Sequence, residues 1–208
     1  MQRSGSADSK PDDTFGQSVE QEVKRFLSRE RLRFDDNTAS YNQPDFTLYF
    51  PADQLFFLEV KEKRQSYNMR NWPAFAPEAD LFILDDLTVR KCLAYSPYAG
   101  ILVRNNLLHI YRFFSVIDLA LMPKLRVNRV IERETQDIKG KWLINLQNGW
   151  EANSMDESFW CIQHYLRDLP AILFDHHPCY GNYVGEEISS GGVVRQPAHW
   201  DTDVTETR

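Results

Sequence analysis

Three residues early in the chain, Asp45, Glu59 and Lys61, have the types and spacing that hydrolytic chemistry requires. Glu59 and Lys61 are separated by a single residue, so on a β-strand both side chains point to the same side. The stretch 55–60 around them is almost entirely apolar. A carboxylate and an ammonium group are costly to bury in such surroundings unless they are paired or have a function.

Two carboxylates and a lysine suit the metal-assisted hydrolysis of a phosphate ester. Mg²⁺ prefers oxygen ligands, usually one or two carboxylates together with waters and substrate phosphate. A nearby lysine can orient or deprotonate the attacking water, or stabilise charge in the transition state. Asp45 begins the strand that precedes the strand of Glu59, so it reaches the same place if the two strands lie side by side.

The elements that must position these groups follow a regular order. Thr14 with Gln17 resembles a capping box, and apolar residues at helical spacing continue from there to about Glu30. The later pattern predicts strands at 32–34, 45–50 and 55–63, a helix from Asp85 or Asp86 that stops before Pro97, and strands at 100–104 and 107–114. The apolar run at 55–60 indicates a central strand that is covered on both faces.

Pro44-Asp45, a strand-length interval and Glu59-Val60-Lys61 together resemble the motif of the PD-(D/E)xK nuclease superfamily, which has the restriction-endonuclease-like fold. Members of that superfamily share a core of helix, three strands, helix and strand, which is the order predicted here for residues 14–104. The resemblance implies an α/β fold with a mixed central sheet and a C-terminal α+β extension. It also implies that Asp45 and Glu59 bind Mg²⁺ (or Mn²⁺) and that Lys61 acts on the water.

Many members also carry a glutamate on the first helix, in a pattern of glycine, three residues, glutamate, two residues and an aliphatic residue. Gly16, Glu20 and Val23 match this pattern, which implies that Glu20 adds a metal ligand directly or through water. Helix geometry alone does not select Glu20, because Glu20 and Glu22 flank the apolar stripe at similar angles on opposite sides.

The function that the resemblance implies is a metal-dependent endonuclease that hydrolyses phosphodiester bonds in DNA, with RNA as an open alternative. Restriction, mobile-element and repair enzymes all use this scaffold, and restriction or host defence is the first expectation here. A homodimer would present one site to each strand. The alternative is a non-catalytic binding module on a nuclease-like scaffold. A simpler interpretation places Glu59 and Lys61 on a solvated edge strand and Asp45 in a turn, but the apolar flanking residues argue against it.

The pattern divides the chain into four parts. Residues 1–13 are polar, and we expect them to form a flexible tail. We expect residues 14–125 to form the nuclease core and residues 126–184 an extension packed on the core. Residues 185–208 are expected to form an irregular tail. Within the extension we expect a strand at 141–146 and a helix that Ser154 and Glu157 cap and that ends near Leu169. Whether the extension is a separate domain or wraps the core stays open.

The net charge of −6 argues mildly against a nucleic-acid partner, because phosphate contacts need lysine and arginine. The distribution of charge softens that objection. Six lysines and arginines lie between Lys124 and Lys141 against three acidic residues, and a second basic cluster runs from Lys61 to Arg70. The first cluster suits phosphate contacts and a solvated basic face about equally well.

Membrane association is not expected. No apolar run reaches the roughly 20 residues of a membrane span, since the best stretch, 113–122, is short and contains Asp118. Residues 1–13 lack the apolar segment of a secretory signal, and the three scattered cysteines do not form a disulfide framework. We therefore expect a cytoplasmic protein with reduced thiols.

Two cysteines and two histidines in the second half of the chain offer a set that can bind structural zinc: Cys161, His164, His176 and Cys179. Cys161 and His164 lie one helical turn apart and can face the same way. Cys161 nevertheless has aromatic and aliphatic neighbours, which suit a packed thiol. Ordinary packing is therefore the favoured interpretation, and bound zinc would support the binding-module alternative.

Overall fold

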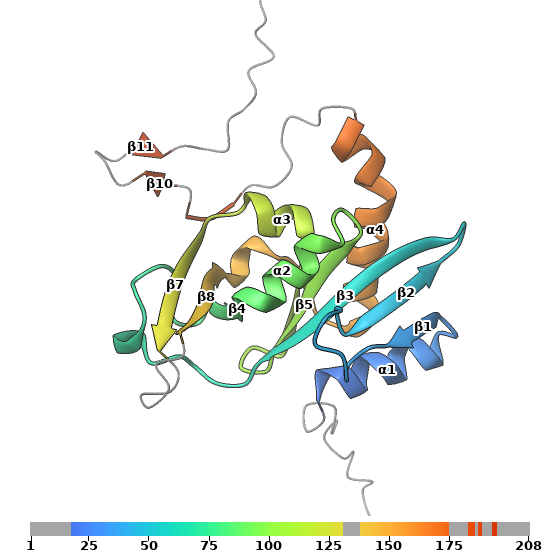
Figure 1. The fold of residues 1–208 in the computed structure, drawn as a ribbon, viewed down its shortest axis with the longest axis horizontal. Coiled ribbons are helices and arrows are strands. Elements are labelled where there is room, and N and C mark those ends of the chain that lie inside the picture. The colour runs from blue at the N-terminus through green and yellow to red at the C-terminus, as the bar shows by residue number, and fades with distance from the viewer. Residues whose placement is uncertain (1–17, 131–137, 175–182, 186, 189–192, 195–208) are drawn as a thin grey trace, which may run out of the picture.

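The computed structural model is built around one mixed β-sheet (Figure 1). It describes residues 18–130, 138–174, 183–185, 187–188 and 193–194. The sheet has the strand order β1-β2-β3-β5-β6-β9. Its strands are β1 (Arg33–Asp36), β2 (Phe46–Phe50), β3 (Gln54–Lys63), β5 (Ala99–Asn105), β6 (Ile110–Ser115) and β9 (Trp150–Ala152). Neighbouring strands are antiparallel except for β3 and β5, which run parallel.

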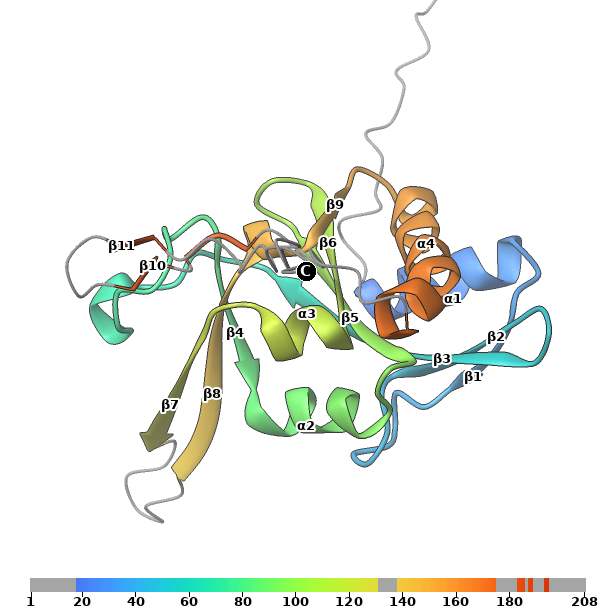
Figure 2. The same ribbon diagram turned by 90° about the horizontal axis from the view of Figure 1, so that it is seen from above.

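Helices cover both faces of this sheet (Figures 1 and 2). On one face, α1 (Val19–Arg29) and α4 (Met155–Phe174) share a core with the side chains of Leu58 and Val60. On the other face, α2 (Asp86–Ala94) and α3 (Val116–Leu121) share a core with Ile101 and Val103. Successive side chains of a strand alternate between these two cores, which is why the central strands are apolar over most of their length.

A second sheet lies beside α2. Its strand order is β4-β8-β7, with β4 (Leu81–Asp85), β7 (Lys124–Val130) and β8 (Ile138–Asn145) all antiparallel to their neighbours. Phe82, Leu84 and Ile144 enter the same core as α2 and α3. Figure 2 shows β7 and β8 extending past α2 as a pair. The remaining elements are the short helices η2 (Met69–Asn71) and η3 (Leu146–Asn148) and the strand pair β10 (Glu187–Ile188) and β11 (Val193–Val194).

The predicted order of helix, three strands, helix and strand is present as α1, β1, β2, β3, α2 and β5, with the additional strand β4 between β3 and α2. Within the described residues α1 begins at Val19, with Ser18 as its N-cap, and the predicted capping pair of Thr14 and Gln17 lies outside them. Among the elements of the two sheets and their helices, β4, α3, β7 and β9 were not predicted, and neither were the short elements η2, η3, β10 and β11. In the sequence, the residues of β7 stand out only as part of a basic cluster.

Residues beyond 125 complete both sheets. The strand predicted at 141–146 is the second half of β8, β9 adds the last strand to the central sheet, and α4 covers one of its faces. The predicted cap of α4 is confirmed, because Ser154 Oγ accepts from the backbone N–H of Glu157 at 3.1 Å. The helix continues through Pro170 to Phe174 instead of ending near Leu169. The described residues of this part of the chain therefore share the sheets and the core with the residues before them.

No helix in the described part of the chain is both long enough and apolar enough to cross a bilayer. The apolar stretch 113–122 is divided between the end of β6 and the helix α3.

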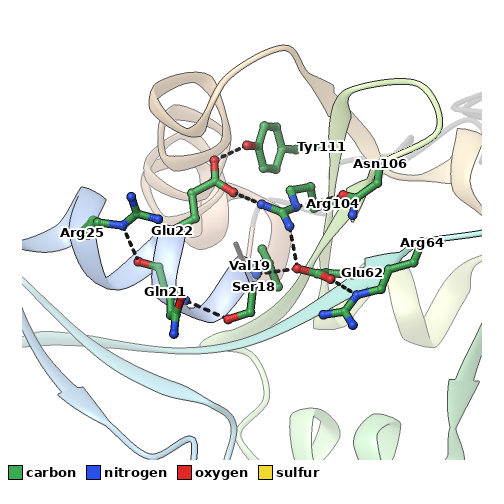
Figure 3. A network of polar contacts seen from close by, with 10 residues as sticks. All are labelled: Ser18, Val19, Gln21, Glu22, Arg25, Glu62, Arg64, Arg104, Asn106 and Tyr111. Atoms are coloured by element: carbon green, nitrogen blue, oxygen red, sulfur yellow. Dashed lines mark hydrogen bonds and ion pairs between the residues drawn. The ribbon is translucent and has the colours of Figure 1, made fainter. Parts of the chain in front are cut away.

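A buried ion network joins α1 to the central sheet (Figure 3). The guanidinium group of Arg104, on β5, lies 2.6 Å from Glu22 Oε2 and 2.7 Å from Glu62 Oε1. Glu62 Oε1 also accepts from the backbone N–H of Val19 at 2.5 Å, and the hydroxyl of Tyr111 donates to Glu22. A buried charge that loses its partner is strongly destabilising, so the network fixes the start of α1 against β3 and β5.

Lys63, the last residue of β3, anchors the segment that leads to β4. Its buried ammonium group donates to the carbonyl oxygens of Glu78 (2.9 Å), Ala79 (2.5 Å) and Leu81 (2.9 Å). Hydrogen bonds from a charged donor are stronger than neutral ones, so three of them hold this segment firmly against the central sheet.

We expect the substitution Lys63→Met to lower the free energy of unfolding by about 3 kcal/mol, because three carbonyl groups lose their donor. Equilibrium unfolding in denaturant measures this as a lower midpoint. The control is Lys24→Met, which breaks an exposed ion pair with Asp36 and should cost about 1 kcal/mol or less. Equal losses for the two variants would show that the anchor contributes no more than a surface ion pair.

Candidate active site

Asp45, Glu59 and Lys61 come together on the face of the central sheet that α2 covers. Asp45 directly precedes β2, and its Oδ2 accepts from the backbone N–H of Val60 in the adjacent strand β3 at 2.8 Å. Lys61 Nζ lies 2.6 Å from Glu59 Oε1 and 3.6 Å from Asp45 Oδ2. The three residues that the sequence analysis selected therefore form one cluster.

A second lysine, which the sequence analysis missed, completes the cluster. Lys91 of α2 places its Nζ 3.0 Å from Glu59 Oε2 and donates to the carbonyl oxygen of Gln43 at 3.0 Å. Its neighbour Cys92 is fully buried in the core beneath α2, which fixes this face of the helix toward β3. Glu59 thus lies between two ammonium groups, one at each carboxylate oxygen.

The charges of the cluster are mutually compensated. Glu59 is only 1% exposed, and a buried carboxylate is tolerable only when it is paired. Burial raises the pKa of the Asp45 carboxyl above its ordinary value, despite the attraction of Lys61. Burial by itself would lower the pKa of Lys61, but the attraction of Glu59 and Asp45 outweighs it and the pKa is raised. The two carboxylates therefore favour the charged form of Lys61.

A cleft of about 600 Å³ opens in front of the cluster. The loop before β2 contributes Tyr41 to one wall, α2 contributes Asp86 and Arg90, and the beginning of β8 contributes Lys139 and Gly140. Asp45, Glu59 and Lys61 line the same cleft. The second sheet, which is joined to the core through α2, thus forms part of the enclosure around the residues predicted to do chemistry.

The donor set fits a hard divalent cation such as Mg²⁺ or Mn²⁺. Asp45 and Glu59 offer carboxylate oxygens, the ligand type that these ions prefer. Within the described residues, no group of three or more histidine, cysteine, aspartate and glutamate side chains is placed to hold a metal ion. A cation at Asp45 and Glu59 would thus take its other ligands from water and substrate phosphate, which is the usual arrangement for Mg²⁺.

The structure does not bring Glu20 to this cleft. Helix α1 packs on the opposite face of the central sheet, and the negative charge of Glu20 acts instead on Arg64. Glu22 is the buried glutamate of α1, but it is bound to Arg104 on that same far face (Figure 3). Gly16, the first residue of the predicted pattern, lies outside the described residues.

The four residues considered for zinc cannot be placed as a set. Cys161 is buried in the core between α4 and the central sheet, which agrees with a packed thiol. His164 lies at 2.9 Å from Asp168 and packs against two tryptophan rings. His176 and Cys179 lie outside the described residues.

Comparisons with known proteins find similarity in structure only. No protein-family model matches the chain, and no curated protein matches it. The structure of a Holliday junction resolvase from the archaeal hyperthermophile Archaeoglobus fulgidus is 12% identical, with 60% of this chain and 86% of that chain covered and a TM-score of 0.35. A nuclease from a fusselovirus is 9% identical, with coverages of 73% and 89% and a TM-score of 0.40.

The predicted fold class, an α/β protein, is confirmed by the structure itself. The chain is a mixed α/β protein with a mixed central sheet in the expected element order, and it is structurally similar to the two nucleases. TM-scores this low say nothing about activity.

We expect Glu59→Ala to destabilise the protein in EDTA by about 3–5 kcal/mol, because Lys61 and Lys91 would be left together without their shared carboxylate. Asp45→Ala should cost less, since Glu59 still compensates Lys61 in that variant. Thermal and denaturant unfolding of the two variants test this order. A Glu59→Ala protein as stable as the wild type would show that the two lysines do not depend on Glu59.

Proposed function

We propose that the protein is a metal-dependent endonuclease that hydrolyses phosphodiester bonds in DNA. The observation that carries the proposal is the convergence of Asp45, Glu59 and Lys61, with the Lys61 ammonium group 2.6 Å from Glu59 and 3.6 Å from Asp45 in one cleft. The alternative of a solvated edge strand does not fit, because β3 lies between β2 and β5 and Glu59 is buried.

Each residue has a role that its position supports. Asp45 and Glu59 would hold Mg²⁺ (or Mn²⁺), which when bound polarises the phosphoryl oxygen and offsets negative charge in the transition state. Lys61 carries a positive charge directly beside both carboxylates, so it can donate a hydrogen bond to an attacking water or to a phosphate oxygen. Glu20 has no role in this proposal, because α1 lies on the opposite face.

The second lysine takes part in the same arrangement. A cation bound at Glu59 would compete with Lys61 and Lys91 for its two oxygens. Both ammonium groups would then be available to the negatively charged phosphate at the same place. Phosphoryl-transfer sites commonly combine bound metal with lysine in this way.

The wider setting is proposed on chemical grounds. An enzyme that cuts both strands of a duplex is served by a homodimer, because two-fold symmetry presents one site to each strand. Restriction, host defence and mobile-element activity are cytoplasmic processes that such an enzyme would serve.

The test is cleavage of supercoiled plasmid and of single-stranded DNA by the purified protein in Mg²⁺, Mn²⁺ or EDTA. We expect cutting only with metal. Lys61→Ala and Asp45→Asn should each lower the cleavage rate by about 100-fold or more, because each removes a group that acts on the reacting phosphate. Asp156→Asn, which changes an exposed carboxylate on α4, is the matched control and should cut at the wild-type rate.

Cutting that survives both site substitutions would place the activity elsewhere and overturn the assignment. A protein that is folded, binds DNA and cuts none of the substrates would instead favour the non-catalytic binding module. The stability of each variant should be measured in parallel, so that loss of fold is not taken for loss of chemistry.

A further inference from the structure

Asp86, the first residue of α2, holds two arginines at the edge of the cleft. Its Oδ2 lies 3.0 Å from Arg90 Nε, one turn further along the helix, and its Oδ1 lies 3.1 Å from Arg126 Nε on β7. The indole N–H of Trp142 donates to the same Oδ1 at 2.7 Å. The Asp86 side chain is only 12% exposed, so this carboxylate is held by the fold.

The two guanidinium groups are oriented and still face solvent. Each guanidinium group contacts Asp86 through its Nε, which is only one part of the planar fork of five N–H donors. The side chains of Arg90 and Arg126 are 68% and 60% exposed. Because they bind the two oxygens of one carboxylate, the two cationic groups lie close to each other at the surface.

This arginine pair lies beside the proposed active site. Asp86 and Arg90 line the same cleft as Asp45, Glu59 and Lys61. The approach of β8 to the start of α2 depends on a glycine, since a Cβ at Gly140 would lie 3.0 Å from Asp86 Cβ and 3.4 Å from Arg126 Nη2. The fold therefore brings β8 so close to the start of α2 that a side chain at position 140 would crowd Asp86.

We infer that Arg90 and Arg126, oriented by Asp86, form a phosphate clamp that binds the DNA backbone next to the scissile phosphate. Two arginines held in fixed orientation can bind the oxygens of a phosphate through several charge-assisted hydrogen bonds. Their orientation by Asp86 reduces the conformational entropy that is lost on binding. DNA as the ligand rests on the proposed function, whereas the phosphate chemistry follows from the arginines themselves.

The chain contains a matched control for this arrangement. Arg167 on α4 is 65% exposed and is also bound through Nε by an aspartate, with Asp168 Oδ1 at 2.8 Å. Helix α4 covers the face of the central sheet opposite to α2, so this pair is remote from the cleft. A general effect of removing a surface arginine should therefore appear in Arg167→Ala as well.

The first experiment measures binding of a short fluorescein-labelled DNA duplex by fluorescence anisotropy in EDTA, over a series of salt concentrations. Arg90→Ala and Arg126→Ala should each reduce the slope of log affinity against log salt by about 0.9, the value for one lost phosphate contact. Arg167→Ala should keep the wild-type slope. Slopes in the two cleft variants equal to that of Arg167→Ala would overturn the clamp.

The second variant, Asp86→Asn, separates orientation from net charge. It removes a negative charge from the binding surface, so charge alone predicts tighter DNA binding. The clamp predicts binding weaker than wild type by about threefold or more, because the arginines lose the group that orients them. Thermal unfolding verifies that the variant is folded, and a folded Asp86→Asn protein that binds DNA more tightly would contradict the role of Asp86.

The outcomes for the clamp and for the nuclease are distinguishable. Reduced slopes in Arg90→Ala and Arg126→Ala together with no metal-dependent cutting by the wild type would support the clamp and contradict the proposed function. Metal-dependent cutting that requires Asp45 and Lys61, together with unchanged salt slopes for Arg90→Ala and Arg126→Ala, would support the proposed function and contradict the clamp. Tighter binding of an RNA duplex of the same sequence, also dependent on Arg90, would overturn the assignment to DNA.

Discussion

Strand β3 carries four charged side chains through the middle of the sheet, and each of them requires a partner: Glu59, Lys61, Glu62 and Lys63. Moving a charge out of water costs several kcal/mol unless an opposite charge or hydrogen bonds compensate it. Alternation along the strand sends Glu62 to the face of α1 and the other three to the face of α2. Their partners come from the residue before β2, from β5, from the start of α1, from α2 and from the segment before β4. The buried charges of β3 must be compensated by opposite charges or hydrogen bonds. This requirement produces the candidate site and also fixes the elements around β3.

The cluster in the cleft is close to electrically balanced, with the carboxylates of Asp45 and Glu59 beside the ammonium groups of Lys61 and Lys91. A balanced interior offers little long-range attraction to a polyanion. That attraction would come from basic side chains at the edge of the cleft, on α2, β7 and β8. The net charge of −6 is therefore compatible with a nucleic-acid ligand, because what matters is the local arrangement of charge rather than its sum.

The motif residues and most strands of the central sheet could be predicted from the sequence, because strand alternation and apolar neighbours are local properties. The positions of Lys91 and of the arginine pair held by Asp86 could not be predicted, since helical spacing does not tell which strand or sheet a helix face meets. Glu20 was selected by a spacing pattern, whereas the packing of α1 on the far face is decided by contacts that spacing does not encode. Strand β4 is too short an apolar run to distinguish from a helix. Helix α3 had a readable signal, since Ser115 and Asp118 form a capping box, but the segment was read only for its hydrophobicity.

The pairing of β4 with β8 has a consequence for synthesis of the protein. β4 precedes α2 in the chain, yet its partner follows β7, so the second sheet cannot form until β8 has left the ribosome. Domains begin to fold while the chain is still being made, from the N-terminal side. A nascent chain that has completed β3, α2 and β5 already contains every motif residue but lacks the wall of the cleft that Lys139 and Gly140 provide. The cleft in its full form is therefore assembled only after β8 has been synthesised, later than the motif residues themselves.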